Sequence, residues 1–155
     1  MSGQAEARLK ELGIVLPKPT APVANYVPFV VTGNLVFIAG QGAVGPEGLA
    51  YLGRVGENVS LEDGQKSARM CALNLIAQVK AACDGDLDRV VRCVRLGGFV
   101  NCANDFTDQP VVINGASDLM VEVFGDAGRH ARTAVGVNVL PLGLSVEVDG
   151  VFEIA

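Results

Sequence analysis

The sequence predicts a single α+β domain with the element order β-β-α-β-α-β-β, in which a mixed sheet carries two long helices on one face. Its 155 residues, half of them hydrophobic, suit one compact core. Two long segments place apolar residues at helical spacing, and the other apolar segments are rich in β-branched residues or alternate with a period of two. We therefore treat residues 1–155 as one domain, with a short helix and an extended lead over residues 1–21.

The first half of the chain is expected to form a short helix, a β-hairpin and a long helix. Prolines keep the lead extended, a Thr-Gly-Asn turn joins the two strands, and Ser60 with Asp63 gives a capping signal for the long helix. The expected elements are a helix at 4–12, strands at 26–31 and 35–39, a glycine-rich loop at 40–56 and a helix of about 22 residues from residue 60.

The second half is expected to contain a strand, a second long helix and two final strands. These elements are a strand at 90–100, a helix at 110–124 and strands at 133–140 and 146–154. The last two strands flank Pro141-Leu142-Gly143, so we expect them to form a hairpin that pairs Val139 with Val146.

The strand Leu35–Ala39 is apolar on both faces, which predicts an oligomer. Two helices on one side of the sheet leave its other side to be covered, and a second copy of the chain is the simplest cover. The alternative is a monomer in which the N-terminal helix and the glycine-rich loop fold over that side.

Composition excludes several classes of function. A net charge of −5 without a basic run indicates against nucleic acid as a partner, and no apolar run is long enough for a membrane helix. The charged N-terminus has no signal-peptide pattern, so a cytoplasmic location is expected. The cysteines lack metal-ligand spacing and are expected to be buried thiols, while His130, the only histidine, is expected in a solvated loop.

Arg132 and Glu147 are the candidate catalytic residues. The guanidinium fork of arginine suits a carboxylate, and a glutamate in the same cleft can hold a water, which together fit hydrolysis of a small anion. In the expected hairpin the two residues lie roughly 20 Å apart, so a shared site would need Glu147 from a neighbouring copy. The alternatives are a surface salt bridge for Arg132 and a solvated acid for Glu147.

Five further positions could line such a cleft. Ala134 beside the arginine leaves room for a ligand, and Gly40-Gln41 ends an apolar strand where backbone amides can approach a ligand. Tyr26 begins a strand and Asn114 lies within the second long helix. The alternatives are a strand-end anchor for Tyr26 and a solvated side chain for Asn114.

The segment from Arg132 to Pro141, followed by Val146-Glu-Val-Asp149, resembles the C-terminal signature of the reactive intermediate deaminase family, also called the YjgF or L-PSP endoribonuclease family. The resemblance extends to residues 25–27, 38–41 and 104–106. It implies a chorismate-mutase-like fold, a homotrimer with a central barrel of sheets, and clefts between subunits.

The activity implied by the resemblance is hydrolysis of enamines and imines of amino acids to 2-oxo acids and ammonia, without a cofactor or metal. The small carboxylate-bearing substrate would meet Arg132 as its carboxylate ligand and Glu147 as the acid that orients water. The remaining positions implied are Tyr26, Gly40, Gln41, Asn114 and Ala134.

The chain departs from the family pattern at three places. Ala134 replaces a cysteine, Ala39 replaces a serine, and the stretch between Phe106 and Asn114 is longer than in the best-known members. Two other functions stay open: a regulatory protein that binds a carboxylate metabolite without turnover, and an endoribonuclease. The acidic balance of the chain disfavours the second.

Overall fold

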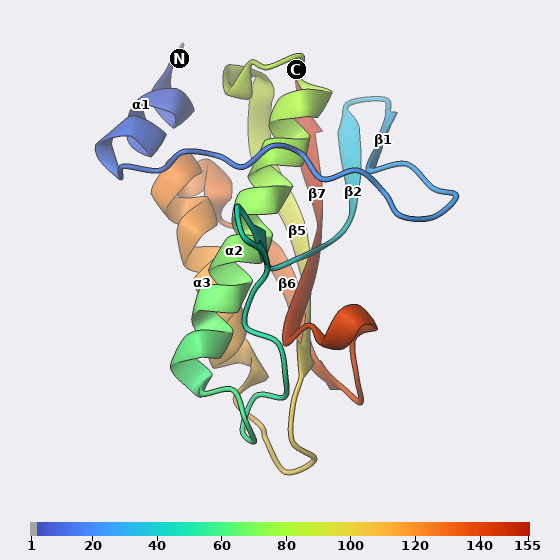
Figure 1. Cartoon of the computed structure of the whole chain (residues 1–155). Coiled ribbons are helices and arrows are strands. Elements are labelled where there is room, and N and C mark those ends of the chain that lie inside the picture. The colour runs from blue at the N-terminus through green and yellow to red at the C-terminus, as the bar shows by residue number, and fades with distance from the viewer. Residues whose placement is uncertain (1–2) are drawn as a thin grey trace.

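The computed structural model describes residues 3–155 and shows a five-stranded mixed sheet with both long helices on one side (Figure 1). This architecture confirms the expected α+β fold. The elements are α1 (Gln4–Glu11), β1 (Phe29–Thr32), β2 (Leu35–Gly42), β3 (Val44–Gly45), β4 (Gly48–Leu49), α2 (Leu61–Ala82), η1 (Leu87–Arg89), β5 (Val90–Asn101), α3 (Gln109–Phe124), η2 (Gly125–Gly128), β6 (Ala131–Val137), η3 (Pro141–Gly143) and β7 (Val146–Ile154).

The two long helices form where the apolar periodicity predicted them. The Ser60 hydroxyl accepts a hydrogen bond from the Asp63 amide at 3.1 Å, which caps α2 at its N-terminus. The apolar stripes of both helices are buried against β2, β5 and β7, and all four cysteines are buried thiols. The core therefore fills the space between the helix layer and one face of the sheet.

The order of the strands corrects the expected pairing of the last two. The sheet runs β1-β2-β7-β5-β6, so β5 separates β6 from β7 and the predicted hairpin between Val139 and Val146 is wrong. Strand β6 instead pairs with β5 in parallel, with Arg132 beside Leu96, while β7 pairs antiparallel with β5 and β2. Helix α3 supplies the crossover connection that a parallel pair requires.

Three boundaries also differ from expectation. Strand β1 begins at Phe29, so Tyr26 lies in the bend before it. Strand β2 continues to Gly42, and the short β3–β4 hairpin occupies part of the expected loop. Strand β6 begins at Ala131 and ends at Val137.

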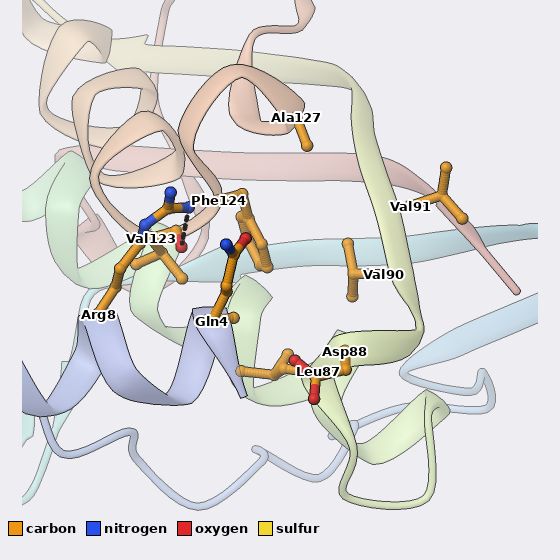
Figure 2. A pocket seen from close by; sticks show the side chains of 10 residues that line it. Gln4, Arg8, Leu87, Asp88, Val90, Val91, Val123, Phe124 and Ala127 are labelled. Atoms are coloured by element: carbon orange, nitrogen blue, oxygen red, sulfur yellow. Dashed lines mark hydrogen bonds between the residues drawn. The ribbon is translucent and has the colours of Figure 1, made fainter. Parts of the chain in front are cut away.

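The N-terminal segment packs on the helix layer. Figure 2 shows Arg8 of α1 extended toward the C-terminal end of α3, where it donates a hydrogen bond to the Val123 carbonyl at 3.3 Å. Ala5 and Leu9 are buried there, whereas Leu12, expected on the same face, is exposed. The shallow cavity beside Arg8 measures about 180 Å³. Helix α1 thus closes the end of the core and does not cover the other face of the sheet.

That other face, which we call the open face, presents exposed apolar side chains. By strand alternation it carries Val30, Phe37 and Val135, which are 52%, 46% and 40% exposed. The β3–β4 hairpin contacts α2 on the helix side. Neither segment proposed to cover this face in a monomer does so.

The two long helices pack so closely at Gly115 that no side chain fits there. A Cβ at this position of α3 would lie 2.1 Å from the backbone carbonyl oxygen of Gln65 in α2. We expect Gly115→Ala to force the helices apart and lower the free energy of unfolding by about 1–3 kcal/mol, measured by urea denaturation. The control is Asp118→Ala, an exposed site on α3. Equal or greater stability of Gly115→Ala would show that the helices can separate freely.

Candidate functional site

Arg132 points from the edge strand β6 toward helix α3. Its Nη1 atom donates hydrogen bonds to Oδ1 of Asn114 at 2.8 Å and to Oγ of Ser117 at 3.2 Å. Asn114 and Ser117 lie three residues apart on α3 and therefore face β6 together. Both acceptors are neutral, so they orient the guanidinium without neutralising it.

No acidic residue that the structure describes compensates the charge of Arg132. Among residues 3–155, no carboxylate forms an ion pair with it. Its Nε and Nη2 atoms donate no hydrogen bond to any residue that the structure describes. A partly buried guanidinium with two unused donor groups is suited to bidentate binding of a carboxylate. The alternative of an ordinary surface salt bridge is therefore wrong for Arg132.

Small residues follow Arg132 along the same face of β6. Ala134 pairs with Gly98 and is partly buried, and Gly136 lies next along the face. Beyond Gly136 is a cavity of about 340 Å³, lined by Gln109 and the loop that precedes α3. With Ala134 and Gly136 at these positions, this side of the site offers space and backbone groups.

Glu147 lies on the open face of the sheet, next to Gly40. The neighbouring β7 residues Val146 and Val148 are buried under the helices, so Glu147 points the other way. A Cβ on Gly40 would come within 2.7 Å of the Oε1 atom of Glu147. Only glycine at position 40 leaves the carboxylate where it is. Burial, and then repulsion from Asp149, raises the pKa of Glu147 above its ordinary value.

Tyr26 lies near the same end of β2 as Gly40. It is 50% exposed and lines an open hollow of about 590 Å³ together with Phe37 and Ala39. Ala39 and Gly40 form the bulge where the register between β2 and β7 shifts. Tyr26, Gly40 and Glu147 therefore gather around the β2 bulge, where they form one group.

The side chain of Gln41 does not join this group, and the expected approach of a ligand to its backbone amide stays a prediction. The residue is 5% exposed and faces the helix side of the sheet. Its Oε1 accepts a hydrogen bond from the Thr20 hydroxyl at 2.9 Å, and its Nε2 donates to the Ala39 carbonyl at 3.0 Å. Gln41 thus ties the N-terminal lead to the bulge that presents Gly40.

The two groups of candidate residues lie on opposite faces of the sheet. Arg132 is level with Leu96 of β5, and Glu147 is level with Phe99 of the same strand. They are therefore separated by about 10 Å along the strands and about 10 Å across them. We call the group around Arg132 the arginine half-site (Arg132, Asn114, Ser117, Ala134) and the group around Glu147 the glutamate half-site (Glu147, Gly40, Tyr26).

His130 contacts the arginine half-site through Ser117 and is partly buried, so the expectation that it is solvated was wrong. Its Nδ1 lies 2.6 Å from the Gly128 carbonyl oxygen, and its Nε2 lies 2.9 Å from Oγ of Ser117. Ser117 was missed altogether. The signal available in the sequence was its position three residues after Asn114, on the helix face that packs against β6.

The structure shows no metal centre or membrane-spanning helix over residues 3–155. No group of three or more His, Cys, Asp or Glu side chains comes together there in a way that could hold a metal ion. No helix in this part of the chain is both long and apolar enough to cross a bilayer.

The raised pKa of Glu147 predicts a pH-dependent effect of its neutralisation. Ionisation is harder in the folded protein than in the unfolded chain, so the charged carboxylate lowers stability as the pH rises from the ordinary value of 4.5 through the raised pKa. We expect the stability of Glu147→Gln relative to the unsubstituted protein to increase as the pH rises from 4.5 through the raised pKa, measured by urea unfolding at equal protein concentration. The gain should shrink in an Asp149→Asn background. A stability difference that is constant with pH would contradict this.

Comparison with known proteins places the chain in a family. Residues 6–152 match the family described as "YjgF/chorismate mutase-like, putative endoribonuclease". Protein TCP17 of Trypanosoma cruzi is 47% identical over 99% of this chain and 96% of its own length. The crystal structure of Atu1372 from Agrobacterium tumefaciens, a protein of unknown function, is 47% identical, with a TM-score of 0.91 over 98% of this chain and 94% of that one.

A third match is a crystal structure from Shewanella oneidensis that is described as a "putative endoribonuclease". It is 35% identical and has a TM-score of 0.94 over 97% of this chain and 99% of that one. The matches cover the sheet, both long helices and both half-sites. The chain therefore belongs to the YjgF, or reactive intermediate deaminase, family and has its chorismate-mutase-like fold.

Proposed function

We propose that this protein is a homotrimeric deaminase that hydrolyses small 2-imino or 2-enamino carboxylates to 2-oxo acids and ammonia. The observation that carries the proposal is the uncompensated guanidinium of Arg132, held in place by neutral acceptors beside small residues. Family membership supports the reaction class, since the family resemblance implies this activity. The site would need no cofactor or metal.

The position of the half-sites supports an active site shared between copies. Arg132 and Glu147 cannot reach one small molecule within one chain, because β5 lies between their strands and they face opposite sides. The exposed apolar side chains of the open face, among them Phe37 and Val135, provide a surface for association. In a closed ring, the arginine half-site of each copy would meet the glutamate half-site of its neighbour.

Substrate binding in this proposal depends on the free donor edge of Arg132. The Nε and Nη2 groups take the substrate carboxylate, while Asn114 and Ser117 hold Nη1 and fix the plane of the guanidinium. The absence of a large side chain at Ala134 leaves room for the imine carbon and its substituent. Orientation is the main contribution, because protonated imines already react readily with water.

The chemical step in this proposal uses Glu147 of the neighbouring copy. Its carboxylate takes a proton from water as the oxygen bonds to the imine carbon, and the C=N electron pair moves to nitrogen. The same carboxyl group then returns the proton to nitrogen. As the C–N bond breaks, the carboxylate takes the proton of the new hydroxyl group and the C=O bond of the 2-oxo acid forms. The released ammonia takes up that proton and leaves as ammonium. The raised pKa of Glu147 makes it a stronger base than an ordinary glutamate.

Endoribonuclease activity, which the family description includes, has less support from this chain. The net charge is −5, whereas RNA-binding surfaces are basic to neutralise phosphates. Arg132 is a single cation, and other arginines such as Arg69, Arg95 and Arg129 are paired with carboxylates. The other alternative, a protein that binds a carboxylate metabolite without turnover, would use the same arginine half-site. The assay described below distinguishes binding from hydrolysis.

Arg132→Ala tests the carboxylate clamp. We expect a loss of at least about 100-fold in kcat/KM for a 2-imino acid generated in situ by an amino-acid oxidase, because the substrate is no longer oriented. The readout is ammonia release above the rate in buffer alone. Arg69→Ala, on the helix layer and paired with Glu122, is the matched control and should retain full activity.

Light scattering must show that the Arg132→Ala variant keeps the assembly of the unsubstituted protein, a trimer of 16.1-kDa chains. Unchanged hydrolysis in Arg132→Ala would overturn the clamp. A 2-oxo acid that stabilises the unsubstituted protein against heating, with no imine hydrolysis above the buffer rate, would instead indicate a binding protein.

A further inference from the structure

Ser117 connects Arg132 to His130, which is the only histidine of the chain. Oγ of Ser117 lies 3.2 Å from Nη1 of Arg132 and 2.9 Å from Nε2 of His130. The imidazole is therefore within about 6 Å of the guanidinium, a distance at which two charges interact appreciably in a partly buried site. Ser117 is the bridge, and it is itself partly buried.

The hydrogen bonds determine which nitrogen of His130 carries the hydrogen and to which atom the Ser117 hydroxyl donates. The Gly128 carbonyl can only accept, so Nδ1 of His130 carries the hydrogen in the 2.6 Å contact. In the neutral imidazole Nε2 is then an acceptor, and it receives the Ser117 hydroxyl hydrogen. The lone pairs of Ser117 Oγ are thereby turned toward Arg132, which donates to them.

We propose that Ser117 and His130 are positioning residues for the Arg132 guanidinium, and that carboxylate binding at Arg132 is coupled to proton uptake by His130. The inference rests on the proposed role of Arg132 as the carboxylate ligand. It goes further because it gives a role to Ser117 and His130, which are not themselves carboxylate ligands, and makes the affinity of the site depend on pH.

The direction of the coupling follows from charge. Burial, and to a lesser extent repulsion from Arg132, lowers the pKa of His130, against the opposing effect of the Gly128 hydrogen bond. A carboxylate bound to Arg132 cancels the repulsion and favours the imidazolium. Because linkage is reciprocal, the imidazolium must favour the carboxylate, so affinity increases as the pH falls through the titration of His130.

The other charged groups around His130 are engaged elsewhere. On α3, Glu122 pairs with Arg69, and Asp118 lines a groove on the α2 side. Near η2, Asp126 pairs with Arg129, and Arg92 of β5 donates to the Arg129 carbonyl. Arg132 is thus the charged neighbour whose state changes when an anion binds.

The experiment follows the Cε1–H resonance of His130 by NMR. The untagged chain has one histidine, so the signal needs no assignment. The pH titration is recorded without ligand and with an excess of pyruvate as the carboxylate probe. We expect the midpoint to rise with pyruvate, and the pyruvate affinity to be about 3- to 10-fold higher below that midpoint than above it.

Three variants separate the parts of the coupling. Arg132→Gln should raise the midpoint of the free protein and abolish its response to pyruvate. His130→Gln keeps an amide able to bond Ser117 and Gly128 but cannot titrate, so the pyruvate affinity should lose the change that follows the His130 midpoint and keep any change that follows Glu147. Ser117→Ala should raise KM for the imine, because Nη1 of Arg132 loses one of its two acceptors.

The outcomes distinguish this inference from the proposed function. A midpoint that does not move at the highest pyruvate concentration, or that moves equally in Arg132→Gln, overturns the coupling. Arg132-dependent imine hydrolysis with an unmoved midpoint removes the coupling and leaves the deaminase. A pyruvate-dependent midpoint without imine hydrolysis keeps the coupling and removes the deaminase.

Discussion

The parallel pairing of β5 with β6 is the constraint on which the site depends. It places β6 at the edge of the sheet with Arg132 facing α3, and it leaves β7 between β2 and β5 with Glu147 on the open face. A β6–β7 hairpin would have put both residues on neighbouring strands of one copy. With β5 between them, Arg132 and Glu147 lie on opposite faces of the sheet, and this arrangement supports the proposal that a second copy completes the site.

The second physical feature is that the positive charge of Arg132 stays available to an anion. Asn114 and Ser117 satisfy one nitrogen of Arg132 with neutral oxygens, so the guanidinium is ordered but still attracts an anion. The surroundings of Glu147 instead disfavour its charge, because the carboxylate is partly buried against the backbone of Gly40 and lies beside Asp149. An oriented cation and a carboxylate of increased basicity are what the hydrolysis of an anionic imine requires.

Local sequence patterns predicted where the helices and strands lie. Contacts between segments far apart in the sequence could not be predicted from them. The Ser60 cap, the apolar stripes of both long helices and the alternation of residues 146–154 each have a local cause, and all three were predicted correctly. The β6 pairing depends on β5, some 35 residues earlier, which no local pattern reveals. No local pattern predicts that the β2 bulge turns the Gln41 side chain toward the helices. The solvated position expected for His130 was wrong because its partner Ser117 comes from another element.

The central claim, that neighbouring copies complete one site, is tested most directly by mixing two inactive variants. Arg132→Ala and Glu147→Gln chains are co-expressed with different tags, and the mixed trimers are isolated and assayed with a freshly generated 2-imino acid. Each mixed trimer has one site that combines the intact arginine half-site of one variant with the intact glutamate half-site of the other, so about a third of the unsubstituted activity should be restored. Mixed trimers as inactive as either parent would contradict the shared site.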